Sequence, residues 1–162
     1  MRAFRRSRHQ FVAVFTPDEA GTLSILASQV LALLEDRGSR EADPAMLRLL
    51  PDAYSDDAEA SAEFRRFTAD DLASRKAANA RRIVADLATA AGATSATAVK
   101  VDAQAAEAWV RSLTDIRLTI AARLGIETDG GSRDPEPLDP AMLDLYDWLG
   151  FVQGSLVDCM DR

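Results

Sequence analysis

One long amphipathic helix constrains the fold more than any other part of the sequence. In residues 103–126, AQAAEAWVRSLTDIRLTIAARLGI, large apolar side chains recur every three or four positions, which is the spacing of one helix face. This stripe consists of Trp109, Leu113, Ile116, Ile120 and Leu124. Leu118 lies on the opposite face, and a helix that is apolar on more than one side usually packs against several neighbours. The sequence therefore predicts a central helix over about 103–125.

The flanking patterns predict more helices and a small sheet. Residues 3–5 and 10–15 are rich in β-forming side chains and indicate a hairpin, and residues 96–101 alternate as a third strand does. Helices are expected at about 17–36, 45–50, 56–64, 69–91 and 140–160, because capping residues precede them. These caps are Thr16, Asp43, Ser55, Thr68 and Asp139, and Asp102 is the expected cap of the central helix. We therefore expect an α+β fold, predominantly α: a helical bundle around the central helix, with a small antiparallel sheet.

Length and composition limit the classes of protein to consider. The 162 residues suit a single domain, 1–162, and the Gly-, Pro- and Asp-rich stretch 127–138 is expected to be a flexible loop. A net charge of −7 argues against broad, non-specific nucleic-acid binding. No apolar run reaches the roughly 20 residues of a membrane span. We expect a cytoplasmic protein that does not enter a membrane.

Two basic segments are nevertheless candidates for nucleic-acid contact, and each has a simpler interpretation. Four arginines near the N-terminus either bind phosphates or protect an exposed edge strand from aggregation: Arg2, Arg5, Arg6 and Arg8. Four cations in the helix predicted at 69–91 either meet a nucleic acid or form a solvated face paired with acids: Arg75, Lys76, Arg81 and Arg82. The simpler interpretation is favoured for both segments, because neither has the pattern of a recognition motif.

Catalytic and metal-binding patterns are absent from the sequence. His9 is the sole histidine, so no Ser/His or Cys/His arrangement can form, and there is no glycine-rich phosphate loop. Acidic residues between Asp52 and Glu63 lack the spacing and the glycine of a calcium loop. We expect no enzymatic activity, no metal and no cofactor.

The last predicted helix carries the candidate interface and the single cysteine. Trp148, Phe151 and Val152 are candidates for a partner surface or a homodimer contact, since Phe151 falls among outward-facing acids. The alternative is that Phe151 is only a locally covered aromatic residue. Cys159 rules out an intrachain disulfide because it has no second cysteine to join. It follows Asp158 at a helix C-terminus, where the environment favours the neutral thiol, so a redox role is disfavoured. The alternative is an intermolecular disulfide across a dimer.

Three segments together resemble a known family: residues 43–68, 108–126 and 145–157. They are DPAMLRLLPDAYSDDAEASAEFRRFT, AWVRSLTDIRLTIAARLGI and LYDWLGFVQGSLV. They are similar to the actinobacterial domain-of-unknown-function family twenty-seventeen, the AosR-like oxidative-stress-responsive regulators. The resemblance implies a cytoplasmic transcription regulator whose partners include an alternative sigma factor or RNA polymerase. It also implies a cysteine-pair switch, which this sequence lacks.

The resemblance leaves an alternative function open. Genes of this family commonly lie beside the gene for the Clp adaptor ClpS, which suggests a helical scaffold or adaptor linked to Clp proteolysis. The polar residues that match the family are interpreted as a buried or half-buried network joining the middle segment to the central helix, or else as the lining of a ligand cleft. These residues are Arg48, Asp52, Tyr54, Arg65, Asp115, Arg117 and Arg123.

Overall fold

The computed structural model describes residues 1–36, 43–51, 61–125 and 139–161, with only the backbone for 61–68. The elements follow one another as β1 (Arg2–Ser7), β2 (Gln10–Phe15), α1 (Pro17–Glu35), α2 (Pro44–Leu49), α3 (Ser61–Ala91), β3 (Thr97–Val101), α4 (Ala103–Arg123) and α5 (Pro140–Met160). The predominantly helical α+β prediction is confirmed. The stretch predicted as a loop, 127–138, lies outside the described residues.

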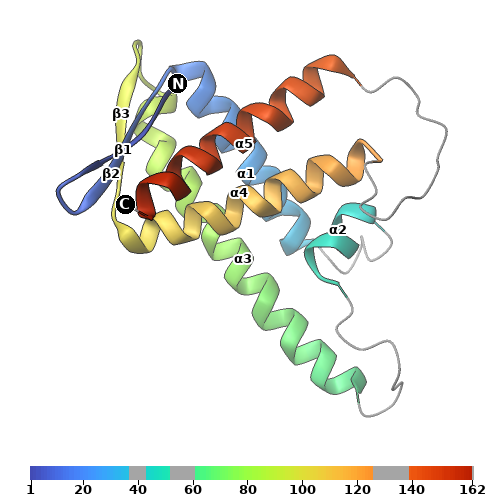
Figure 1. Ribbon diagram of the computed structural model, residues 1–162. Helices are drawn as coiled ribbons and strands as arrows, with labels where there is room; N and C mark the ends of the chain where they lie inside the picture. Colours follow the sequence, from blue (N-terminus) through green and yellow to red (C-terminus); the bar gives the residue numbers. More distant parts are fainter. Residues whose placement is uncertain (37–42, 52–60, 126–138, 162) are drawn as a thin grey trace.

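The three strands form one antiparallel sheet in the order β1-β2-β3. β1 and β2 are joined through the two-residue turn Arg8-His9, and Phe11 of β2 faces Val101 of β3. The helices lie on one side of this sheet (Figure 1). Phe11, Ala13 and Phe15 alternate along β2 and belong to the core that the sheet forms with the helices. The predicted hairpin and third strand are therefore confirmed.

Helix α4 occupies the centre of the bundle, as its two-sided apolar pattern predicts. It contacts all four other described helices as well as β2 and β3. Trp109, Leu113 and Ile116 of its main stripe are almost completely buried. Figure 1 shows α4 beside α5, with α2 near its C-terminal end. The sheet, α1, α3 and α5 therefore share one core with this helix.

Local capping residues start α1, α4 and α5 at the predicted positions. Thr16 Oγ1 accepts from the Glu19 N–H at 3.3 Å while the Glu19 carboxylate accepts from the Thr16 N–H at 2.8 Å, which completes a capping box. Asp102 caps α4 by accepting from the Ala105 N–H at 2.8 Å. Asp139 caps α5 and is followed by Pro140 at the first helical position.

The predicted separation of a helix at 56–64 from a helix at 69–91 was wrong. Thr68 does not begin a helix, because α3 runs without interruption over 31 residues from Ser61 to Ala91. No proline or glycine occurs in this range, and a capping residue is tolerated inside a helix when nothing breaks the chain. Helix α4 spans Ala103–Arg123, in agreement with the predicted range of about 103–125, and Gly125 follows with a φ of 65°, a common helix-terminating conformation.

Candidate functional site

A buried ion pair joins α3 to α4. The Asp115 carboxylate, in a residue only 2% exposed, accepts a hydrogen bond from the Lys76 ammonium at 2.5 Å. Burial raises the pKa of Asp115, and the hydrogen bond and charge of Lys76 oppose that rise. Thr119 donates to the main-chain carbonyl of Asp115 at 2.9 Å. The two charges neutralise each other inside the fold, so this pair links α3 to α4.

Arg117 lies on another side of α4 and contacts α5. Its guanidinium donates to Gln153 Oε1 at 3.0 Å and lies 4.6 Å from the centre of the Tyr146 ring. Gly150 lies beside this guanidinium, where an added Cβ would make an ordinary van der Waals contact at 3.7 Å. Gln153 in turn donates to the Val110 carbonyl at 3.1 Å. Arg117 and Asp115 therefore belong to separate contacts.

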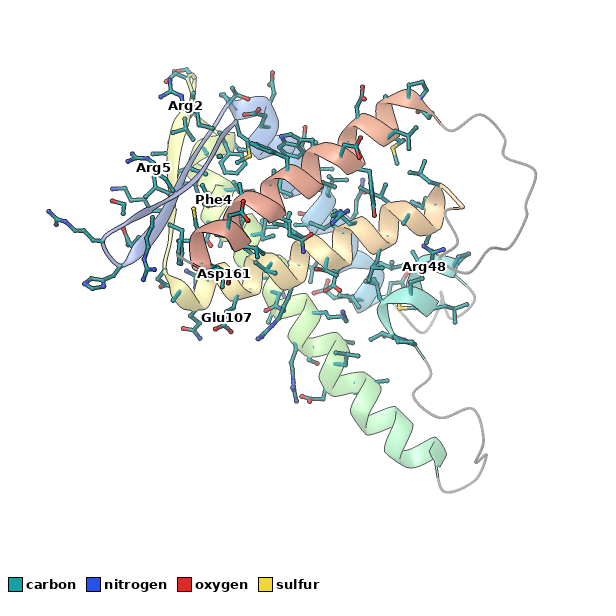
Figure 2. The ribbon with its side chains drawn as sticks, viewed as in Figure 1. Arg2, Phe4, Arg5, Arg48, Glu107 and Asp161 are labelled. Carbon is teal, nitrogen blue, oxygen red and sulfur yellow. The ribbon has the colours of Figure 1, made fainter. Side chains whose placement is uncertain are left out.

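The other members of the predicted polar network are distributed along the molecule. Arg48 is half-buried on α2, and Figure 2 places it far from Arg2 and Arg5 of the sheet. Arg123 is exposed at the end of α4 and borders an open hollow with residues 43–45. Asp52 and Tyr54 lie outside the described residues, and only the backbone of Arg65 is described. A single network of all seven residues stays a prediction.

The four cations of α3 that were candidates for nucleic-acid contact are each paired with a carboxylate. The pairs are Arg75–Asp71, Lys76–Asp115, Arg81–Glu35 and Arg82–Asp86. The acids come from α1, α3 and α4, so this part of α3 is neutralised by its own fold. Arg2, Arg5, Arg6 and Arg8 differ, because each is exposed and none pairs with a carboxylate in the part of the chain that the structure describes.

The thiol of Cys159 joins α5 to the edge of the sheet. It donates to the Phe4 carbonyl at 2.9 Å, and Ser155, one turn earlier, accepts from the Phe4 N–H at 3.3 Å. Only a protonated thiol can donate this bond, so a thiolate would lose it and would face a carbonyl oxygen instead. This geometry suits a structural cysteine rather than a nucleophilic one.

Cys159 is therefore expected to react slowly with a disulfide reagent such as DTNB. The folded chain should react at least tenfold more slowly than the same chain unfolded in urea, because the thiol is half-buried and hydrogen-bonded. Absorbance at 412 nm during labelling measures both rates. Cys159→Ser should keep the thermal midpoint close to that of the original chain, since a hydroxyl also donates. Faster labelling of the folded chain would revive thiol sensing.

The candidate interface on α5 is divided between surface and core. Phe151 is 50% exposed. Asp144, Asp147 and Asp158 are also exposed on this helix, and helical spacing places them on the same face as Phe151. Trp148 is half-buried and packs against the core. Val152 was wrongly included in this surface, because it is fully buried within the chain. The apolar stripe that contains it faces the bundle.

The sequence interpretation missed the partner of the central tryptophan. Trp109 donates its indole N–H to Asp86 Oδ2 of α3 at 2.9 Å, and the same carboxylate accepts from Arg82 Nε at 3.0 Å. A buried indole requires an acceptor, so Trp109 itself indicated that one exists. Helical periodicity does not reveal which of the many acids supplies it. For the same reason, helical periodicity did not identify Lys76 as the partner of Asp115.

Neither a metal cluster nor a membrane-spanning segment occurs in the part of the chain that the structure describes. Within the described ranges, no three Asp, Glu, His or Cys side chains group as metal ligands would. None of the described helices has the length and apolarity needed to span a bilayer.

Comparison with known proteins establishes the family. Residues 1–160 match the family described as "Domain of unknown function (DUF2017)". The "Oxidative stress regulator AosR" of Mycobacterium tuberculosis is 28% identical over 94% of this chain and 83% of its own length. The related AosR protein of Mycobacterium leprae is 26% identical over 91% and 81%. No solved structure matches significantly. The predicted resemblance is confirmed, and this chain belongs to the DUF2017 family.

Proposed function

We propose that this chain is a cytoplasmic, non-catalytic regulatory protein that acts at transcription during oxidative stress through a protein contact. Its kinship with proteins named oxidative stress regulators supports the biological setting. It acts without a cysteine pair, since the sequence has one cysteine and its thiol hydrogen-bonds to Phe4. The partner is RNA polymerase or an alternative sigma factor.

The observation that carries this proposal is the exposed aromatic ring on α5. Large apolar side chains are exposed at four described positions, and the aromatic one among them is Phe151. Aromatic residues are preferred anchors of protein interfaces when polar groups surround them. Gly154, about one turn further along, has no side chain that could cover the ring. Phe151 can therefore enter a partner's pocket while α5 approaches closely.

The charges around Phe151 specify the chemistry of that partner. Asp144, Asp147 and Asp158 are exposed along the same helix face and make it negatively charged. A basic surface with an apolar pocket would complement this face. A second copy docked through the same α5 face would instead bring two acidic faces together, which is unfavourable. The face therefore favours a basic partner surface over a symmetric homodimer through α5.

Binding to purified RNA polymerase tests the proposal. The chain is immobilised, and core polymerase and individual alternative sigma factors from the same organism are applied in turn while biolayer interferometry records binding. Phe151→Ser is expected to weaken binding at least tenfold, which is the effect of losing an interface anchor. Ile25→Ser is the matched control, because Ile25 is similarly exposed, at 59%, but lies on α1. The control should bind as the original chain does.

Two results would contradict this function. The first is that no polymerase subunit or sigma factor binds the folded chain at micromolar concentration. The second is that Phe151→Ser and Ile25→Ser weaken binding equally, which would remove α5 from the contact. Circular dichroism of each variant must match the original chain, since both side chains are exposed and neither supports the core.

A further inference from the structure

The outer face of the sheet carries positive charge that the fold does not neutralise. Since Phe11, Ala13 and Phe15 face the helices, Val12 and Val14 point to the opposite, helix-free face. The register places Arg5 of β1 and Lys100 of β3 on either side of Val12. Val12 is only 6% exposed although no helix covers this face, which is what the aliphatic stems of the flanking cations would produce.

An irregularity in β1 brings a third cation to the same face. Arg2 pairs with Val14 and Arg5 with Val12, so the three steps along β1 match two along β2. Residues three apart on a regular strand point to opposite faces, whereas this bulge places Arg2 and Arg5 on one face. Figure 2 shows Arg5 on the side away from the helices and Phe4 on the helix side.

The hairpin turn extends this cationic face into an open hollow. The hollow measures about 550 Å³ and is lined by Ser7, Arg8, His9, Gln10, Val12 and Lys100. Arg8 adopts a φ of 56° in the turn. The polar side chains of this lining form no hydrogen bond or ion pair with the described residues. Their donors are therefore available to a ligand.

The candidate cations of α3 are paired within the fold, whereas those of the outer sheet face are not paired with any described residue, which favours an external anion as their partner. Every candidate cation of α3 has a carboxylate partner, whereas Arg2, Arg5, Arg8 and Lys100 have none among the residues described. The chain as a whole carries a net charge of −7, so acidic residues are abundant. The lack of described carboxylate partners at these four cations therefore does not come from a shortage of acids. We propose that the outer sheet face, defined by Arg2, Arg5, Arg8, His9 and Lys100, binds the phosphate backbone of duplex DNA without reading its sequence.

The composition of the outer sheet face favours phosphates over other anionic partners. The large apolar side chains that the described structure exposes are Ile25, Leu47, Leu72 and Phe151, all on helices. An acidic protein partner would require such an anchor on the sheet. Single-stranded nucleic acid would require aromatic rings for base stacking. Arginine, lysine, serine and glutamine are common phosphate-contacting side chains, and they bind phosphates without an apolar anchor or aromatic rings.

This inference goes beyond the proposed function, because it concerns a different surface and a different ligand. The protein contact uses Phe151 on α5, whereas the DNA contact uses the strands and their turn. Adjacent cations on β1 and β3 are two strand spacings apart, about 9.6 Å, so they meet separate phosphates or opposite sides of one backbone. A regulator held at a promoter by a protein contact would gain a weak, sequence-independent contact with neighbouring DNA.

Fluorescence anisotropy with a labelled 20-base-pair duplex tests the proposal. Binding is measured between 25 and 200 mM KCl, and the slope of log K against log salt counts the phosphates contacted, at about −0.9 for each. Arg5→Gln/Lys100→Gln is expected to reduce the size of the slope by about 1.8. The matched control is Arg75→Gln/Arg111→Gln, which changes the net charge equally at two exposed, acid-paired cations and should leave the slope unchanged.

Two further measurements keep the test decisive. Amide shifts in a ¹⁵N-labelled sample should move in β1, the turn and β3 when duplex DNA is added. Arg8→Gln repeats the slope test outside the paired strands, so a folding defect in the sheet variant would not obscure the result. The proposal is overturned if DNA does not bind at 25 mM KCl, if the control variant loses as much of the slope, or if poly-L-glutamate binds this face as tightly as DNA.

Discussion

Lys76→Met is expected to lower the free energy of unfolding by about 3 kcal/mol at pH 7, because it leaves a buried carboxylate without its cation. Asp115 is 2% exposed, and Lys76 is the ion-pair partner that the structure gives it. Methionine fills much of the lysine volume, so the loss reports the missing charge rather than a cavity. Urea denaturation followed by circular dichroism measures the difference.

The loss should shrink as the pH falls. Burial already raises the pKa of Asp115 in the folded protein, and removing Lys76 takes away the two interactions that lower it. A carboxyl whose pKa is higher folded than unfolded binds its proton more tightly when folded, so stability rises as pH falls through the folded pKa. The difference between Lys76→Met and the original chain should therefore be smaller at pH 5 than at pH 7.5.

The neighbouring residue provides a matched control. Arg75→Met removes a cation one position away whose side chain is 74% exposed and paired with Asp71 on the surface. Exposed pairs contribute little, so this variant should change stability by less than about 1 kcal/mol at either pH. Lys76→Met/Asp115→Leu should recover most of the loss, since both charges are gone. A small, pH-independent effect of Lys76→Met would mean that Asp115 is solvated.

Trp109→Ala is expected to lower the free energy of unfolding by about 4 kcal/mol, because it removes a large and completely buried side chain. Its ring is completely buried and meets Phe4 edge-on, with centroids 5.7 Å apart and planes at 83°. It also lies 6.2 Å from the Phe15 ring, so one side chain of α4 joins both strands of the hairpin to the helices. Removing it leaves a cavity where the sheet meets the bundle.

Trp109→Phe separates packing from hydrogen bonding. Phenylalanine keeps an aromatic ring but loses the N–H that Asp86 accepts at 2.9 Å, so a loss of about 1–2 kcal/mol is expected. Trp148→Ala is the control for tryptophan removal, because Trp148 is only half-buried and should cost less than Trp109→Ala. Urea denaturation followed at 222 nm compares all three. Equal losses for the two alanine variants would contradict the central position of α4.

The sequence by itself determined the features that depend on neighbouring residues. The caps Thr16, Asp102 and Asp139 start α1, α4 and α5 because their partners lie two or three residues away in the same chain segment. The apolar stripe of α4 determined that this helix would be central, since burial follows from its 3.6-residue period. The sequence also showed that Phe151 interrupts an acidic helix face, but the exposure of its ring was decided by the structure.

Only the tertiary structure decided which distant groups meet. Lys76 reaches Asp115 across 39 residues, and Cys159 reaches Phe4 across 155, so neither contact leaves a local pattern. The bulge that places Arg2 and Arg5 on one face depends on how β1 pairs with β2. Periodicity and capping act over about one helical turn, whereas ion pairs between elements and the register of a sheet are set by how those elements dock. The central helix was therefore predictable, and the partners of its buried polar groups were not.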